Sequence, residues 1–341
     1  MEESIAFLKA RILSLGEVFV EPGCELPRTF SRSTAGPGAG GRSLAFSFRG
    51  TKVKLSITSD ERSPLHLTRE GSFVAGGQEF PGRVRVVPIL LHCPEQAFVN
   101  VEAGCSKGCA FCATPLTPQA VASKLTENRV VGMVLAAAKE PSFKAVAVTG
   151  GVTEDPQNSL DRMLDVVKRV REALPTVPIG VEPYVESPDG VDELREAGAD
   201  EMKINIEAAT GAISAKACPG RNRDAALAGL ERAVKTFGRG MVTSNLIFGL
   251  GESEAELEEC VGMLAAMGVV PNLRALRVDA GNRWRLREAL GFSPSTPSAK
   301  RMMEVARMHK AVLERNGLTT LTFKTMCFPC GCCDIVPFRD V

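Results

Sequence analysis

The chain of 341 residues has few aromatic side chains, few histidines and almost no net charge. It contains one tryptophan, one tyrosine and three histidines, and its formal net charge is +1. Trp284 and Tyr184 offer little aromatic surface on which bases could stack. A nearly neutral chain also creates no field that would attract nucleic acid or an anionic membrane. We therefore expect neither a nucleic-acid partner nor a membrane partner.

The three histidines have no catalytic motif around them. His309 lies in the middle of an expected helix and is expected to face solvent, while His66 and His92 stand outside any motif. General acid–base catalysis by a histidine is therefore not indicated.

A long apolar run and a signal peptide are also lacking. No apolar run reaches the length needed to span a membrane. The acidic segment from Met1 to Leu8 is typical of an amphipathic helix rather than a signal peptide. Eleven cysteines in such a chain favour metal and redox chemistry in a reducing cytosol over disulfides. We therefore expect a cytoplasmic protein.

Three of the cysteines, Cys105, Cys109 and Cys112, follow a C-x₃-C-x₂-C spacing after an apolar run at 97–101. An iron–sulfur cluster normally takes four thiolates, so three thiolates on one loop would leave one iron open to a small molecule. Phe111 can cover such a cluster and keep water away. A structural zinc site usually uses two separated ligand pairs, and no second pair lies near this loop. The spacing therefore predicts a 4Fe–4S cluster with an open iron.

This loop resembles the cysteine motif of the radical SAM superfamily. In that family the open iron chelates the amino and carboxylate groups of S-adenosylmethionine (SAM). An electron from the cluster then splits SAM into methionine and a 5′-deoxyadenosyl radical. The resemblance implies a 4Fe–4S cluster and SAM as cofactors, and an electron donor such as ferredoxin or flavodoxin as a partner.

From about residue 98 to 317, short β-rich runs alternate with amphipathic helical runs, which is typical of a parallel sheet. The expected strands are 97–102, 143–149, 178–183, 201–207, 241–248 and 273–279. The expected helices are 127–139, 159–173, 190–197, 223–237, 254–267 and 298–316. Six such units resemble the partial (β/α)6 barrel of radical SAM enzymes, an α/β fold. Chemistry in parallel barrels lies at the carboxyl ends of the strands, and the cysteine loop follows the first strand.

Three segments are expected in the chain. Residues 1–90 form a small domain with one helix and a β-rich part, in which strands at 44–48 and 53–58 make a hairpin. Residues 91–317 form the barrel, and residues 318–341 form a cysteine-rich tail with an auxiliary metal centre. A glycine-rich stretch at 31–41 can either cradle a phosphate or act as a flexible connector.

Two pairs of residues resemble SAM-binding positions of the family. Gly150 and Gly151 end the second expected strand, where the family presents backbone carbonyls to the amino group of SAM, although Val152 replaces the family's Glu. Asn205 and Glu207 resemble the biotin synthase branch, where Asn and Asp hold the ribose hydroxyls. The two-residue period of a strand predicts that both point to one face.

The end of the fifth expected strand matches the family's G-x-I-x-G-x-x-E pattern, except that Asn245 replaces the first glycine. The resemblance implies that Ile247 packs on the adenine of SAM and that Gly249 allows the turn to lie close to that adenine. Glu182 and Arg277, on the third and sixth expected strands, are weaker candidates because charges at strand ends are usually solvated.

The tail carries Cys327, Cys330, Cys332 and Cys333 within seven residues, which predicts one metal centre. Adjacent side chains point in different directions, so Cys332 and Cys333 are not expected to serve it equally. We favour an auxiliary iron–sulfur cluster, while a zinc knuckle and idle thiols stay open. The tail is expected to fold over the mouth of the barrel. Among the other cysteines, Cys24, Cys218 and Cys260 are interpreted as packing residues, and Cys93 is undecided.

The barrel segments are most similar to biotin and lipoyl synthases, which insert sulfur at unactivated carbons and consume an auxiliary cluster. The short chain, its β-rich start and its tail resemble the two-component lipoyl synthases of archaea and some bacteria. That resemblance implies an acyl-carrying protein substrate and a second radical SAM subunit. The alternatives are a radical SAM methylase, a mutase, a metallocofactor-maturation enzyme or a non-catalytic iron–sulfur scaffold.

Overall fold

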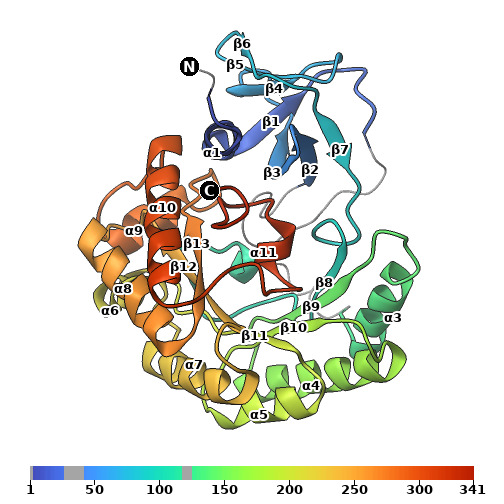
Figure 1. Cartoon of the computed structure of the whole chain (residues 1–341), viewed down its shortest axis with the longest axis vertical. Coiled ribbons are helices and arrows are strands. Elements are labelled where there is room, and N and C mark those ends of the chain that lie inside the picture. The colour runs from blue at the N-terminus through green and yellow to red at the C-terminus, as the bar shows by residue number, and fades with distance from the viewer. Residues whose placement is uncertain (1–2, 27–41, 117–124) are drawn as a thin grey trace.

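The computed structural model describes residues 3–26, 42–116 and 125–341. Two sheets organise these residues, and Figure 1 shows the N-terminal sheet above the barrel sheet. The glycine-rich stretch at 31–41 lies outside the described residues.

The barrel sheet has six parallel strands whose spatial order equals their order in the chain. They are β8 (Gln96–Asn100), β9 (Ala145–Thr149), β10 (Ile179–Glu182), β11 (Glu201–Lys203), β12 (Val242–Phe248) and β13 (Val270–Ala275). In the pairings of the described strands, β8 and β13 are the two edges. The sheet is thus an open partial barrel, and the expected α/β fold class is confirmed.

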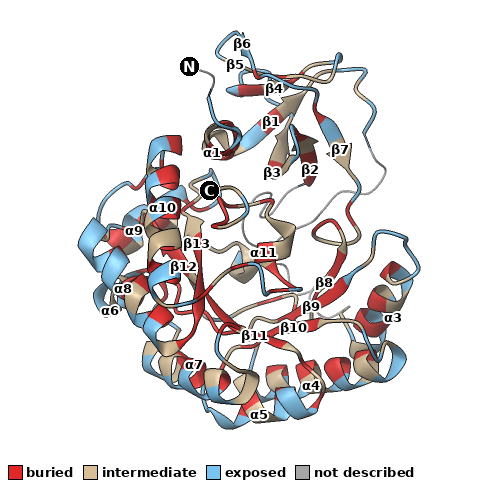
Figure 2. Ribbon diagram, in the orientation of Figure 1, coloured by how far each residue is buried: buried red, intermediate tan, exposed pale blue. Residues whose placement is uncertain are grey.

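Helices cover the outside of this sheet (Figure 1); the first five of them connect successive strands, and the last follows β13. They are α3 (Glu127–Ala137), α4 (Pro156–Ala173), α5 (Asp189–Glu196), α7 (Arg223–Phe237), α8 (Glu254–Met267) and α10 (Ala299–Arg315). The strands are largely buried because helices cover one side and the barrel interior covers the other, as Figure 2 shows. All six expected helices are confirmed. Three short ones were not predicted: α6 (Gly211–Ala217), α9 (Arg283–Leu290) and α11 (Cys327–Cys330).

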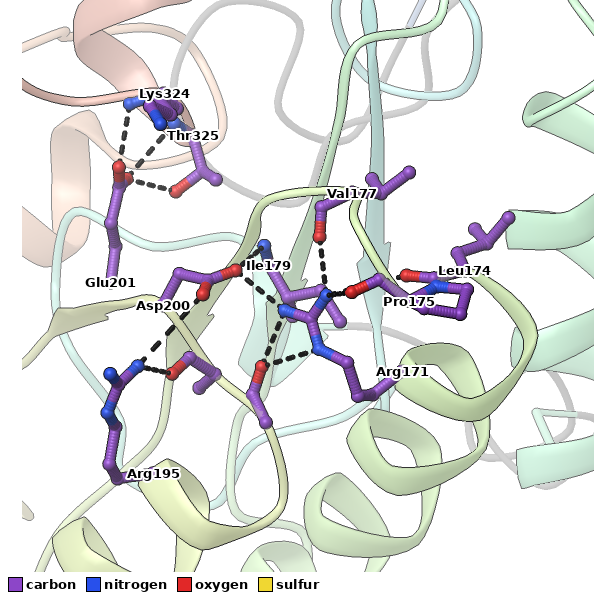
Figure 3. Close-up of polar contacts among 12 residues, drawn as sticks. Arg171, Leu174, Pro175, Val177, Ile179, Arg195, Asp200, Glu201, Lys324 and Thr325 are labelled. Atoms are coloured by element: carbon purple, nitrogen blue, oxygen red, sulfur yellow. Dashed lines mark hydrogen bonds and ion pairs between the residues drawn. The ribbon is translucent and has the colours of Figure 1, made fainter.

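Arg171 fixes the loops that lead into β10 and β11 (Figure 3). Its guanidinium donates to the carbonyls of Val177 (2.9 Å) and Gly198 (2.7 Å) and pairs with Asp200 (2.6 Å). Asp200 in turn accepts from the backbone N–H of Ile179 at 2.9 Å. One side chain of α4 therefore sets how the central strands enter the barrel.

The N-terminal sheet has the strand order β6-β5-β4-β1-β3-β2-β7. Its strands are β1 (Glu17–Val20), β2 (Ser43–Phe48), β3 (Thr51–Thr58), β4 (Leu65–Leu67), β5 (Phe73–Ala75), β6 (Gln78–Glu79) and β7 (Arg85–Val87). The expected hairpin is confirmed as β2 and β3, joined by Arg49 (φ 46°) and Gly50 (φ 81°). Two left-handed residues suit a two-residue hairpin turn. Helix α1 (Ile5–Leu15) packs against both β3 and α10.

The start of the tail, at 324–326, lies at the amino end of the barrel, so the expectation that the tail folds over the mouth is wrong for this part. Glu201, the first residue of β11, accepts from the backbone N–H groups of Lys324 (2.7 Å) and Thr325 (3.0 Å), as Figure 3 shows. Gln96, the first residue of β8, makes two hydrogen bonds to the backbone of Met326, at 2.8 and 2.9 Å. Buried polar side chains need such partners, and the tail backbone supplies them at this end.

His309 is buried and only 1% exposed, so the expectation that it faces solvent is wrong. It belongs to the inward stripe of α10, whose members recur every three or four residues: Met302, Val305, Ala306, His309, Val312 and Leu313. It hydrogen-bonds the carbonyl of Pro271, and burial lowers the pKa of its imidazole to about 3.

This burial predicts a loss of stability in mild acid. Below the ordinary histidine pKa of about 6.5, His309 binds a proton in the unfolded chain but not in the folded protein. The free energy of unfolding therefore falls as the pH drops. The loss should approach about 2 kcal/mol at pH 5. Urea unfolding at pH 7.5 and 5 measures it, and His309→Gln should lose about 2 kcal/mol less than the wild type on acidification. Equal losses in both proteins would contradict this prediction.

Candidate functional site

The predicted cluster cysteines, Cys105, Cys109 and Cys112, lie on the loop that follows β8. Two backbone contacts tie this loop to the rest of the barrel. Ser106 donates its N–H to the carbonyl of Val152 (2.7 Å), after β9, and Ala110 donates to the last residue of α6 (2.8 Å). The loop is therefore held at the carboxyl end of the strands, as the sequence predicts.

Arg285, on the unpredicted helix α9, clamps the backbone of the loop. Its Nη2 donates to three carbonyls, those of Cys109 (2.9 Å), Ala110 (2.6 Å) and Cys112 (2.5 Å). Its Nε is buried and has no hydrogen-bond partner among the described residues. One cationic side chain thus binds three carbonyl oxygens of the cysteine loop.

Asn282, at the start of α9, adds a further contact to the carbonyl of Phe111 at 3.4 Å. Phe111 itself packs on a second apolar cluster that includes Leu250 and Leu286. The sequence reasoning missed Asn282 and Arg285. Helix α9 buries only Leu286 and Leu290, so its apolar residues are too few to show a helical period.

The glycine pair after β9 lies directly against the cysteine loop. A Cβ on Gly151 would stand 2.6 Å from the carbonyl oxygen of Gly104 and 2.9 Å from the Cβ of Cys105. A Cβ on Gly150 would stand 3.1 Å from the side chain of Val101. Only glycine permits this approach. The binding of the SAM amino group by these carbonyls stays a prediction.

The thiols of the loop have polar neighbours suited to a cluster. The Thr114 N–H donates to the sulfur of Cys112 at 3.4 Å, and N–H donors to cluster sulfurs tune such centres. Cys218 is fully buried in the apolar cluster that also contains Cys109, as expected for a packing residue. The three thiols, the glycine cradle and the clamped backbone together fit a 4Fe–4S cluster with one open iron.

Asn205 lies in a buried polar network inside the barrel. Its Nδ2 donates to Glu182 (2.6 Å), and its Oδ1 accepts from the backbone N–H of Asn245 (3.0 Å). Glu182 also pairs with the buried Lys203 at 3.3 Å. Glu182, a weaker candidate from the sequence, is thus joined to Asn205 at the carboxyl end of β10.

Asn205 and Glu207 both lie beyond β11, which ends at Lys203, and Glu207 has φ 63°. The two-residue period therefore does not apply between them, and that expectation is wrong. Arg221 connects the two instead, since its guanidinium donates to the Asn205 carbonyl (2.9 Å) and pairs with Glu207 (3.8 Å). Burial raises the pKa of Glu207. The role of both residues at the ribose stays a prediction.

The motif at the end of β12 forms a tight turn. Gly249 has φ 98°, and Glu252 accepts from the backbone N–H groups of Gly249 (2.6 Å) and Leu250 (2.9 Å). Ile247 is buried just before this turn. The glutamate of the motif thus holds the turn, and contact of Ile247 with adenine stays a prediction.

The tail cysteines fall into two groups. Cys327 accepts from Lys203 Nζ and from Arg274 Nη1, each at 3.7 Å, so its sulfur lies in the barrel interior. The Cys330 thiol instead contacts the thiols of Cys332 and Cys93. The sequence predicted one centre from the four tail cysteines. The structure places a fifth thiol, that of Cys93 before β8, beside Cys330.

Arg277 lies just beyond β13 and joins three parts of the chain. It donates to the carbonyl of Leu13 (2.8 Å) in α1 and to that of Cys333 (3.3 Å) in the tail. Arg277 thus lies at the tail cysteines rather than in the polar network of Asn205 and Glu182. In the described ranges, no three His, Cys, Asp or Glu side chains are arranged to hold a single metal ion.

Comparisons with known proteins agree with this geometry. Residues 99–264 match the family model of the radical SAM superfamily. No curated protein matches the chain. In the part of the chain that the structure describes, no helix is long and apolar enough to cross a membrane.

Several solved structures are similar to this one. HydG, a maturase of the FeFe-hydrogenase, has a TM-score of 0.50 at 18% identity, and the match covers 66% of this chain and 51% of that chain. Methylornithine synthase (PylB) has a TM-score of 0.47 at 18% identity, covering 63% and 61%. Coproporphyrinogen III oxidase (HemN) from Escherichia coli has 0.45 at 15% identity, covering 66% and 53%.

The matches cover about half to three-fifths of these similar structures. At 18% identity, the likeness to HydG supports the fold alone. The family match runs from β8 into α8 and includes the cysteine loop, the glycine pair, Asn205 and the β12 turn. The chain therefore carries a radical SAM superfamily domain.

Proposed function

We propose that this protein is a radical SAM enzyme that inserts sulfur at an unactivated carbon, in the manner of lipoyl synthases. The observation that carries the proposal is a second group of thiols, at the tail, beside a radical SAM barrel whose own cysteine loop is complete. The loop would serve radical formation, and the tail would hold an auxiliary iron–sulfur cluster as the sulfur donor.

The residues of the loop fit the first of these tasks. A 4Fe–4S cluster on Cys105, Cys109 and Cys112, with bound SAM, supplies a 5′-deoxyadenosyl radical. Arg285 keeps the loop backbone in place, and Gly151 lets the β9 turn approach Cys105. The hydrogen atom removed from the substrate leaves in 5′-deoxyadenosine.

The barrel interior supplies a connected set of polar groups. Lys203, Glu182 and Asn205 form a connected chain, and Arg274 faces the same space beside Cys327. The substrate we propose is an acyl group on a carrier protein, with a second radical SAM subunit and a ferredoxin or flavodoxin as partners. A reducing cytoplasm suits the eleven cysteines.

Anaerobic turnover with an octanoylated carrier tests this proposal. Mass spectrometry should show a gain of sulfur on the acyl chain, together with 5′-deoxyadenosine. Cys330→Ala should leave SAM cleavage largely intact and eliminate the sulfur-containing product, because it removes only the auxiliary centre. Cys260→Ala, a change of a buried cysteine in α8, is the matched control and should preserve both products.

Gain of a methyl group, or products without any mass gain, would contradict sulfur insertion and favour a methylase or a mutase. Sulfur insertion that persists in Cys330→Ala would contradict the assignment of the tail as donor.

A further inference from the structure

Cys93 lies in a loop shortly before β8, far from the tail in sequence, yet its thiol contacts that of Cys330. Both Cys93 and Cys332 are almost fully buried, at 2% and 1% exposure. Cys330 contacts Cys93 on one side and Cys332 on the other, and Cys333 also interacts electrostatically with Cys330. The thiols of Cys93, Cys330 and Cys332 are therefore in contact, and the half-buried Cys333 lies near Cys330. The sulfur of Cys327 instead contacts Lys203 and Arg274.

The backbone that carries these thiols is held from three directions. Lys54, on β3, donates its backbone N–H to the carbonyl of Cys332 at 2.8 Å. Lys9, on α1, donates its ammonium to the carbonyl of Gly331 at 2.6 Å. Arg277, beyond β13, donates to the carbonyl of Cys333 at 3.3 Å. Figure 1 shows α11 accordingly between β13 and β8, under the N-terminal sheet.

Positive charges surround the same thiols. The side chain of Lys54 is fully buried and interacts electrostatically with all four of them, and its ammonium donates to the His92 carbonyl at 2.7 Å. Arg274 and Arg277 both interact with Cys333, and Arg274 also pairs with Asp334 at 3.7 Å. Four thiolates carry more negative charge than a divalent ion or a 4Fe–4S core can neutralise. Nearby cations would offset the remaining negative charge.

We propose that Cys93, Cys330, Cys332 and Cys333 bind one metal centre, and that Cys327 is not a ligand of it. This inference rests on the second metal centre of the proposed function but not on sulfur transfer. The centre is joined to the open side of the barrel, between its edge strands and the N-terminal sheet. Cys327 remains in the barrel interior with Lys203 and Arg274.

Metal analysis in a simplified protein tests the ligand set. The background variant has Cys105, Cys109 and Cys112 all changed to alanine, which removes the ligands of the loop cluster. Metal bound by this variant then reports on the proposed centre. Purified without oxygen, it should retain about four iron ions with inorganic sulfide. Adding Cys93→Ala should remove this metal, whereas the matched control Cys327→Ala should retain it.

Loss of the metal in Cys327→Ala, or its retention in Cys93→Ala, would overturn the assignment. One zinc without iron, lost in Cys93→Ala alone, would uphold the ligands but refute the sulfur donor of the proposed function. Cys93→Ala is also made in the otherwise wild-type chain, where continued SAM cleavage shows that the barrel has folded. If that variant does not cleave SAM, Cys93→Ser replaces it, and a folded Cys93→Ser protein that keeps the metal would equally overturn the assignment.

Discussion

Replacing Cys109 with alanine should abolish the reductive cleavage of SAM. Three thiolates are the fewest that leave a single open iron on a 4Fe–4S cluster, so losing one removes the site where SAM binds. Cys109 is the middle cysteine, is buried, and lies in the part of the loop that Arg285 holds. Formation of 5′-deoxyadenosine from SAM, with dithionite as the reductant, measures the effect.

The same loss is expected for Cys105→Ala and Cys112→Ala. Cys260→Ala serves as the control, because its sulfur is buried in α8 away from the loop, and it should cleave SAM at the wild-type rate. Full activity in a variant with all three loop cysteines changed to alanine would refute the cluster assignment.

Arg285→Met should release the cluster from a loop whose cysteines are all intact. Hydrogen bonds that involve a charged group contribute about 1.5–3 kcal/mol each, and Arg285 makes three of them to the loop carbonyls. Methionine keeps much of the side-chain length but removes every donor. SAM cleavage and iron retention should therefore fall at least roughly a hundred-fold.

Iron content after gel filtration and the initial rate of 5′-deoxyadenosine formation measure this effect. Arg287→Met, an exposed change on the same helix, is the matched control and should behave as the wild type. Arg285→Lys should recover part of the activity, since it restores a cation and some of the donors. Wild-type iron content and rate in Arg285→Met would show that the clamp is not needed.

Features that depend on local sequence were predictable in this chain. Helices α7 and α8 begin and end at the predicted residues, because each starts at a polar cap, Asn222 or Ser253, and ends at a glycine. The barrel strands were found largely because parallel strands covered on both sides are rich in apolar residues. The clearest case is β9 (Ala145–Thr149), whereas β11 has only three residues, two of them charged. The spacing of the loop cysteines likewise needs no tertiary information.

Features that depend on distant contacts were not predictable. The tail was misplaced because its position is set by Gln96 and Glu201, which precede it by more than a hundred residues. The position of Cys93 beside Cys330 and that of Arg285 beside the loop have the same origin. A single sequence carries no signal for such pairs, since neither partner has a distinctive local pattern.

The most direct test is the reaction of the reduced protein with SAM alone. The wild-type protein, purified without oxygen and reduced with dithionite, should form 5′-deoxyadenosine and methionine in equal amounts. The Cys105, Cys109 and Cys112 triple alanine variant should form neither above background. Wild-type protein that carries about four irons on the loop cysteines yet forms no 5′-deoxyadenosine would contradict the account.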